Sequence, residues 1–293
     1  MTQPPFGRLV TAMVTPFAAD GSLDLEAAAA LATHLVDEQL NDSLVINGTT
    51  GESPTTTDDE KLRLLEVVLA AVGDRASIIA GVGSFDTAHT IHSAKAAAAL
   101  GVDGLLVVTP YYSRPPQDAL AAHFLTVADA TDVPVMLYDI PHRSGVPIET
   151  DTLIQVGQHP HIVAVKDAKG LPAQSAVVMA STDLAYYAGD DAMLLPLMAV
   201  GGSGVVGTST HFTGARTKAV IDAWLAGDTG TALARYRELL PVYQGVFATQ
   251  GVMLVKAGLN ARGRTVGPVR APLLDASPAQ TSTFVALLDA LDA

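Results

Sequence analysis

The sequence predicts an α/β fold, a (β/α)8 TIM barrel followed by a C-terminal all-helical appendage. Short apolar β-type runs alternate eight times with Ala- and Leu-rich helical runs before Trp224, and only helical runs follow. No hairpin signal joins one strand to the next, so the strands are expected to be parallel and connected by helices. The run 162–165 is apolar on both faces of a strand, which is typical of a buried parallel sheet. An open, doubly wound sheet is the alternative arrangement of the same units.

The elements follow from local patterns along the chain. The first helical run opens after Asp24, a residue type that is favoured at the N-cap. The long run 87–100 is rich in alanine, which has the highest helix propensity. Strands are expected at 8–17, 43–49, 77–83, 104–110, 133–140, 162–167, 184–188 and 204–208. Helices are expected between them at 23–39, 58–72, 87–100, 117–130, 149–156, 172–180, 192–199 and 214–225.

Two domains are expected. Eight strand–helix units complete a barrel, so residues 1–226 are predicted to form the catalytic barrel. Residues 227–293 contain no further strand pattern and are predicted to form a C-terminal helical domain. Its helices are expected at 229–247, 250–259 and 278–291.

Composition excludes several classes of function. The chain has 293 residues, of which 49% are hydrophobic and 16% are charged, so it can bury a sizeable core. A net charge of −13 argues against nucleic-acid binding and against an electrostatic membrane anchor. No apolar run is long enough to cross a bilayer, and no secretion signal is recognised at the N-terminus. There is no cysteine, which excludes disulfides and thiol chemistry, and we expect a cytoplasmic protein.

Polar side chains collect after the predicted strands, at the end where (β/α)8 barrels carry their active sites. They occur at 48–53 (GTTGES), 109–112 (TPYY), 138–145 (YDIPHRSG), 189–191 (GDD) and at Lys166. Loops are polar in general, and this explains the Ser, Asp and Gly residues. It does not explain two tyrosines, an arginine and a lysine at one end of the barrel. The pattern therefore predicts a shared pocket.

Lys166 ends the buried sixth strand, where water is scarce. Desolvation disfavours its ammonium form and lowers its pKa, so that a free amine becomes available near neutral pH. A free amine in a carbonyl-binding pocket is a Schiff-base nucleophile. The alternative is that the side chain only extends its charged end into solvent.

The neighbouring groups suit the same chemistry. Thr49 and Thr50 offer hydroxyls, and the flanking glycines allow backbone N–H groups to approach a carboxylate. Tyr138 offers a phenol that can relay a proton. Arg143 offers a planar guanidinium that fits a carboxylate. Together with Lys166 they predict class I aldolase chemistry on a small α-keto acid and a carboxylate-bearing partner. A non-catalytic barrel that binds a keto acid is an alternative from another class of function.

No cofactor and no metal are expected. The sequence GSGVVG at 202–207 matches a dinucleotide fingerprint, but it begins a strand instead of following one. His89 and His92 are one helical turn apart without an obvious third ligand. Asp190 and Asp191 follow a strand and are interpreted as caps of the next helix.

Several motifs resemble one family. GTTGES at 48–53, YY at 111–112, YDIP at 138–141 with the RSG that follows, and KDAK at 166–169 occur in the order found in the dihydrodipicolinate synthase family. This family belongs to the dihydrodipicolinate synthase / N-acetylneuraminate lyase superfamily. The resemblance runs from about Arg8 to the C-terminal helices. The sequences of several segments are similar to those of the actinobacterial form.

The resemblance implies a reaction. Pyruvate would form a Schiff base with one lysine and condense with L-aspartate 4-semialdehyde, giving 4-hydroxy-tetrahydrodipicolinate for diaminopimelate and lysine biosynthesis. No cofactor beyond the lysine–pyruvate imine is implied, and the protein would be a homotetramer, a dimer of tight dimers. By resemblance, the residues would act as follows: Lys166 as the Schiff-base lysine, Tyr138, Thr49 and Tyr112 as a proton relay with Tyr112 from a neighbouring subunit, Thr50 on the pyruvate carboxylate, Arg143 on the semialdehyde carboxylate, and Gly189 and Val206 as pocket lining.

Two features separate this chain from relatives. N-acetylneuraminate lyases usually have an apolar residue at the position of Arg143, so the resemblance favours the synthase over an aldolase or lyase acting on a sugar acid. Lysine-inhibited members carry a polar cleft, and the resemblance places Pro54, Asp58, Lys61, Phe85 and His89 at its matching positions. Phe85 cannot replace an amide, and Lys61 would repel a ligand ammonium. Weak or absent inhibition by lysine is therefore expected.

Overall fold

The computed structural model describes residues 4–293 and has eight parallel strands in a closed barrel, in the order β1 to β8. This confirms the predicted fold class and excludes the open sheet. By internal contacts the chain divides into two compact units, which are described separately. The first unit comprises residues 4–8 and Ser77–Val206, and the second comprises Leu9–Ala76 and Gly207–Ala293. The predicted division into a barrel of residues 1–226 and a helical domain of residues 227–293 stays a prediction.

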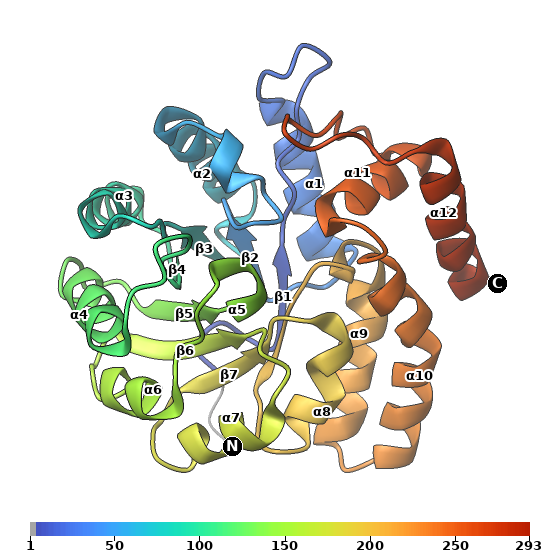
Figure 1. The fold of residues 1–293 in the computed structure, drawn as a ribbon. Coiled ribbons are helices and arrows are strands. Elements are labelled where there is room, and N and C mark those ends of the chain that lie inside the picture. Colours follow the sequence, from blue (N-terminus) through green and yellow to red (C-terminus); the bar gives the residue numbers. More distant parts are fainter. Residues whose placement is uncertain (1–3) are drawn as a thin grey trace. The chain divides into compact units, whose positions relative to one another are not determined.

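The first unit is a sheet covered by helices (Figure 1). Its strands are almost completely buried, as expected for parallel strands joined by helical crossovers. The strands are β3 (Ser77–Gly81), β4 (Gly104–Val108), β5 (Val135–Asp139), β6 (Ile162–Asp167) and β7 (Ala185–Ala188), and β8 (Gly204–Gly207) pairs with β7. The helices are α3 (Thr87–Ala99), α4 (Gln117–Ala128), α5 (Pro141–Ser144), α6 (Thr150–Val156), α7 (Pro172–Met179) and α8 (Leu194–Met198).

A β-bulge fixes the register between β5 and β6. Val135 pairs with Ile162, but Met136 pairs with Ala164, so Val163 is the extra residue. Beyond the bulge, Tyr138 lies opposite Lys166. Because side chains alternate between the two faces of a strand, these two residues share one face, and the residues that follow each of them share the other.

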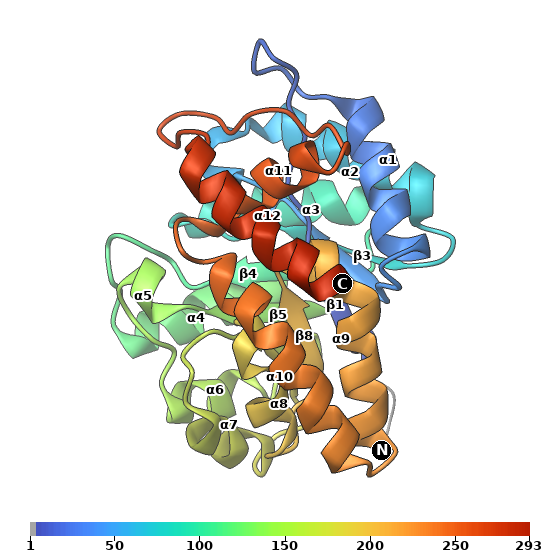
Figure 2. The same ribbon diagram turned by 90° about the vertical axis from the view of Figure 1, so that its right-hand side faces the viewer.

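The second unit combines two strands with six α-helices. β1 (Leu9–Ala12) pairs with β2 (Ser43–Ile46), and both are fully buried. α2 begins with a capping box between Thr57 and Glu60, an arrangement worth about 1 kcal/mol. The C-terminal helices pack on one another, and Figure 2 shows α10 beside α9, with α12 next to α10. The helices are α1 (Leu25–Asp37), α2 (Asp58–Val72), α9 (Thr210–Leu225), α10 (Thr229–Gly245), α11 (Gly251–Ala261) and α12 (Pro278–Asp292).

Several elements differ from the sequence prediction. The first strand, expected at 8–17, is confined to Leu9–Ala12. α9 begins at Thr210, four residues before the predicted start at Gly214. Gly214 therefore lies inside the helix, where a glycine is needed because a Cβ would collide with the backbone carbonyl of Gln39. The one-turn helix α5 was not predicted, since Pro141 at its start and Gly145 at its end both indicate a turn. Asp24 caps α1 as predicted, accepting a hydrogen bond from the backbone N–H of Ala27.

Within residues 4–293, no helix is both long enough and apolar enough to cross a membrane.

Candidate active site

A lysine and a tyrosine lie together at the ends of β5 and β6. The Nζ atom of Lys166 is 4.3 Å from the centre of the Tyr138 ring, and each residue is only 5% exposed. Their proximity follows from the β5–β6 register, which places them opposite each other on one face. Two of the residues expected to share a pocket therefore lie side by side.

Burial lowers the pKa of Lys166 to about 8. The carboxylate of Asp191 opposes this shift, and the guanidinium of Arg143 reinforces it. At pH 7 a lysine with this pKa has about a tenth of its amine unprotonated, against less than about a thousandth for an ordinary lysine. The direction of this shift agrees with the expectation for Lys166, whose role as a nucleophile stays a prediction.

The same burial raises the pKa of Tyr138, and Arg143 opposes the rise. The phenol therefore keeps its proton throughout the neutral range. A neutral phenol beside a partly neutral amine can donate a proton to oxygen while the amine attacks carbon. The arrangement suits carbonyl chemistry.

Gly189 leaves room for the Lys166 side chain. Its amide donates a hydrogen bond to the carbonyl of Asp167 at 2.8 Å. A Cβ at this position would lie 3.1 Å from Cγ of Lys166 and 3.0 Å from Cβ of Ala168. Any side chain here would displace the lysine. Val206, also predicted to line the pocket, is fully buried in β8.

Arg143 lies on α5, directly after β5, and its side chain is exposed. The helix is held in place by Ser144, whose hydroxyl donates to the carbonyls of Ile140 and Val146. An exposed guanidinium near Lys166 and Tyr138, whose pKa values it influences, can meet a negatively charged ligand.

A buried ion pair lies on the opposite face of the same strands and was missed in the sequence. The Nζ atom of Lys169 is 3.0 Å from Oδ2 of Asp139, with side chains 6% and 0% exposed. Lys169 also donates to the carbonyl of Ile148, whose amide donates to Asp139. Burial raises the pKa of Asp139 to about 6, outweighing the opposite effect of Lys169. Asp167 accepts hydrogen bonds from the backbone N–H of Lys169 and the hydroxyl of Ser175.

Asp191 was predicted only as a helix cap. Asp190 is the cap, accepting a hydrogen bond from the amide of Ala192. Asp191 is 1% exposed and acts electrostatically on Lys166. A run of two acidic residues does not reveal which of them faces inward, so the sequence could not separate these roles.

Tyr112 does not belong to the buried pair. Its side chain is 95% exposed, and its backbone has a left-handed φ of 72°. The adjacent Tyr111 packs edge-on against Phe85 with ring centres 5.5 Å apart. The predicted relay role of Tyr112 stays a prediction.

Thr49 and Thr50 lie in the second unit, in the loop after β2, and both are partly buried. The Oγ1 atom of Thr50 is 3.5 Å from that of Thr208. The hydroxyl of Thr15 donates to the carbonyl of Gly51 at 2.7 Å. The loop is therefore tied down directly beside the two threonines.

Among residues 4–293, no group of three or more His, Cys, Asp or Glu side chains could hold a metal ion. The glycine-rich segment 202–207 runs into β8, as predicted, and does not open a helix. A cavity of about 510 Å³ in the first unit is lined by Lys169, Ile148 and Pro141, on the side of the buried ion pair.

Comparison with known proteins identifies the family. A model described as the dihydrodipicolinate synthetase family matches residues 5–291. This chain belongs to that family. It is 60% identical over 289 residues to the 4-hydroxy-tetrahydrodipicolinate synthase of Cutibacterium acnes, and the match covers 99% of both chains. The resemblance stated from the motifs is confirmed.

Solved structures of the family have the same fold. Dihydrodipicolinate synthase from Cyanidioschyzon merolae with lysine bound matches with a TM-score of 0.97 and 38% identity, covering 99% of each chain. The chloride-inhibited dihydrodipicolinate synthase from Acinetobacter baumannii complexed with pyruvate matches with a TM-score of 0.94 and 29% identity, covering 97% of this chain and 98% of that one.

The Asp191→Asn variant tests the electrostatics of Lys166. The Asp191 carboxylate stabilises the lysine ammonium, so its removal should lower the pKa of Lys166 further and increase the unprotonated fraction at pH 7. The pKa is measured as the midpoint of the pH dependence of Lys166 carbamylation by cyanate, followed by peptide mass spectrometry between pH 6 and 10. Asp190→Asn is the matched control and should leave it in place. An unchanged midpoint in Asp191→Asn would contradict the assignment.

Proposed function

We propose that this chain condenses pyruvate with L-aspartate 4-semialdehyde to give 4-hydroxy-tetrahydrodipicolinate, in the diaminopimelate and lysine biosynthetic pathway. The observation that carries the proposal is the buried Lys166 beside the protonated phenol of Tyr138. Membership of the dihydrodipicolinate synthetase family, and relatives that carry the synthase name, support the choice of substrates.

The reaction begins on the amine of Lys166. The amine attacks the keto carbon of pyruvate, and the keto oxygen leaves as water, which gives an imine. The imine withdraws electrons, so the methyl carbon loses a proton and attacks the aldehyde carbon of the semialdehyde. The amino group of the semialdehyde then attacks the imine carbon, closes the ring and releases Lys166. One water is formed in total, and neither a metal nor a redox cofactor takes part.

The remaining groups are assigned by this chemistry. Protons are moved by hydroxyls, the pyruvate carboxylate is held by a hydroxyl in a glycine-rich loop, and the second carboxylate is met by an exposed guanidinium. Small and apolar residues would line the pocket beside the lysine. We assign the proton relay to Tyr138, Thr49 and Tyr112, the pyruvate carboxylate to Thr50, the semialdehyde carboxylate to Arg143, and the lining to Gly189 and Val206.

Tyr112 would act on the active site of a second copy. A tyrosine that is 95% exposed on a left-handed backbone is placed for a partner rather than for its own core. The resemblance to the family implies a homotetramer built from two tight dimers, and we propose that Tyr112 is exchanged within each dimer. The substrates are small molecules, and the cytoplasm is the proposed compartment. The acidic chain has no expected nucleic-acid or membrane partner.

Weak or absent inhibition by lysine is also proposed. In the second unit, the Nζ atom of Lys61 lies 3.5 Å from Oδ1 of Asp58, so the carboxylate of Asp58 already has a cationic partner. In the first unit, Phe85 is 63% exposed and presents an aromatic ring where an amide would be needed. Initial rates should stay near the uninhibited value at lysine concentrations up to about 10 mM. Half-inhibition below about 1 mM would contradict the proposal.

Lys166→Ala should abolish the pyruvate adduct, because no other residue is assigned to the imine. Borohydride reduction in the presence of pyruvate, followed by intact-mass measurement, detects the adduct. Lys95→Ala, which removes an exposed lysine on α3, is the control and should retain it. An adduct that persists in Lys166→Ala would assign the chemistry to another lysine.

An acceptor comparison tests the substrate. Pyruvate consumption should be fast with aspartate 4-semialdehyde and slow with N-acetylmannosamine, because Arg143 suits a carboxylate. Arg143→Leu should raise the KM of the semialdehyde by about tenfold or more while the pyruvate adduct still forms. His142→Leu, on the same short helix, is the control. Consumption only with the sugar would support a sugar-acid lyase, and an adduct without consumption would support a different acceptor.

A further inference from the structure

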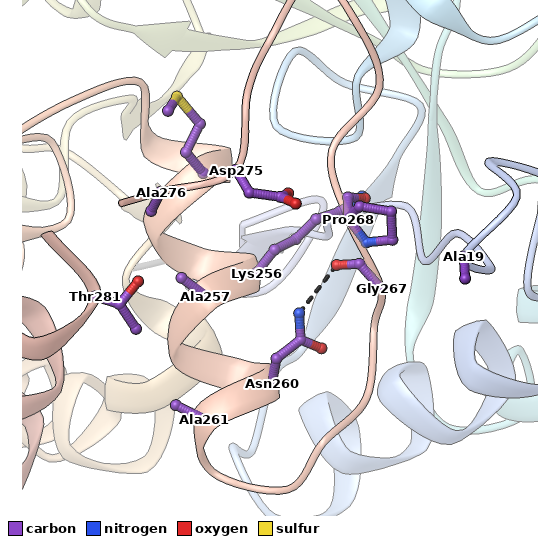
Figure 3. Close-up of a pocket in the computed structure, with 11 residues that line it drawn as sticks. Ala19, Lys256, Ala257, Asn260, Ala261, Gly267, Pro268, Asp275, Ala276 and Thr281 are labelled. Atoms are coloured by element: carbon purple, nitrogen blue, oxygen red, sulfur yellow. Dashed lines mark hydrogen bonds between the residues drawn. The ribbon is translucent and has the colours of Figure 1, made fainter. Parts of the chain in front are cut away.

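A buried ion pair connects α11 to the loop after β2. The Nζ atom of Lys256 is 2.7 Å from Oε1 of Glu52, and both side chains are 2% exposed. Lys256 also donates to the carbonyl of Pro268 at 2.7 Å and lies 4.1 Å from the centre of the Phe17 ring. Figure 3 shows its side chain leaving α11 in the direction of Pro268. All of these residues belong to the second unit.

The second oxygen of Glu52 is also held by the C-terminal segment. The backbone N–H of Arg270 donates to Oε2 at 2.8 Å. The Arg270 guanidinium forms two hydrogen bonds with Glu60, at 2.6 and 2.8 Å, and lies 4.0 Å from the centre of the Phe17 ring. Lys256 and Arg270 therefore both lie against the Phe17 ring. Both also bind the Glu52 carboxylate, Lys256 through Nζ and Arg270 through its backbone N–H.

The backbone of Glu52 is equally constrained. Its φ is 57°, a left-handed conformation that glycine adopts more readily than glutamate. Its amide donates to the carbonyl of Thr49 at 3.1 Å, and its own carbonyl accepts from the amide and the hydroxyl of Thr55. The loop that carries Thr49 and Thr50 therefore ends at a residue fixed through both its side chain and its main chain.

Stability alone does not explain a charged pair here. Burying two charges is costly, and an apolar pair of similar size is often as stable or more stable. An apolar pair, however, offers neither the ion pair that holds one oxygen of the Glu52 carboxylate nor the hydrogen bond that holds the other. The charges are best explained by geometry that they impose on the loop.

The adjacent cavity offers no other role for Lys256. It has a volume of about 640 Å³ and lies between α11 and the segment at Gly267 and Pro268 (Figure 3). The amide nitrogen of Asn260 donates to Gly267, and its oxygen accepts from Val266. Lys256 is likewise directed to partners within the protein. The polar groups beside the cavity are thus used by the fold.

We propose that Glu52 and Lys256 are positioning residues, through which the C-terminal helices set the geometry of the Thr49–Thr50 loop for pyruvate. The inference rests on the proposed function, which assigns the pyruvate carboxylate to Thr50 and part of the proton relay to Thr49. It adds a role for α11 that involves no contact with substrate.

The test compares Glu52→Gln, Lys256→Met and the double variant. Each single variant leaves one buried charge without its partner, so the melting temperature should fall. The double variant removes both charges and should recover most of the melting temperature. If the pair positions the loop, the KM of pyruvate should stay raised by about tenfold or more in all three variants, because small displacements of binding groups have large effects. The KM of the semialdehyde should change little.

Arg262→Met is the matched control. It removes the ion pairs from Arg262, at the end of α11, to Asp289 and Asp292 on α12 and should leave both KM values unchanged. A pyruvate KM that returns to the wild-type value together with the melting temperature in the double variant would overturn the inference and leave the pair a stabilising role only. A wild-type protein that forms no pyruvate adduct on Lys166 would instead overturn the proposed function, and the inference with it.

Discussion

The pairing of β5 with β6 is the constraint on which the proposed chemistry depends. The bulge at Val163 advances β6 by one residue, and this places Lys166 opposite Tyr138. A shift of one residue would exchange the lysine for Asp167 on the inner face, since successive side chains alternate. The register is supported on the outer face, where Lys169 holds Asp139. One face of the strands thus carries the candidate reacting residues, and the other carries a structural ion pair.

Desolvation then gives the two inner side chains complementary properties. Burial destabilises the charged form of every ionisable group, so it lowers the pKa of Lys166 and raises that of Tyr138. The result is an amine that can attack and a phenol that can donate. Asp191 raises the pKa of Lys166 and so limits its fall, whereas Arg143 lowers it further. One physical cause therefore suits Lys166 to the proposed role of nucleophile and Tyr138 to the proposed role of acid.

A second set of buried charges, centred on Glu52 and Lys256, constrains the backbone of a loop. Glu52 is bound at both carboxylate oxygens, and its amide and carbonyl are bound as well. Its left-handed φ persists because these contacts over-determine it. Lys256 and Arg270 supply the contacts from the C-terminal segment. The helices that follow the barrel thereby acquire a connection to a loop that carries candidate site residues.

The sequence by itself determined the fold class, the strand and helix order and the candidates Lys166 and Tyr138. Alternating patterns and residue type are local properties, and eight repeats of one pattern admit few architectures. It also indicated the family through the GTTGES and KDAK motifs. Only the tertiary structure decided which acidic residue faces Lys166, that Lys169 pairs with Asp139, and that Glu52 pairs with a lysine two hundred residues later. These are choices between chemically similar residues, and they depend on register, strand face and long-range contact, none of which leaves a periodic trace in the chain.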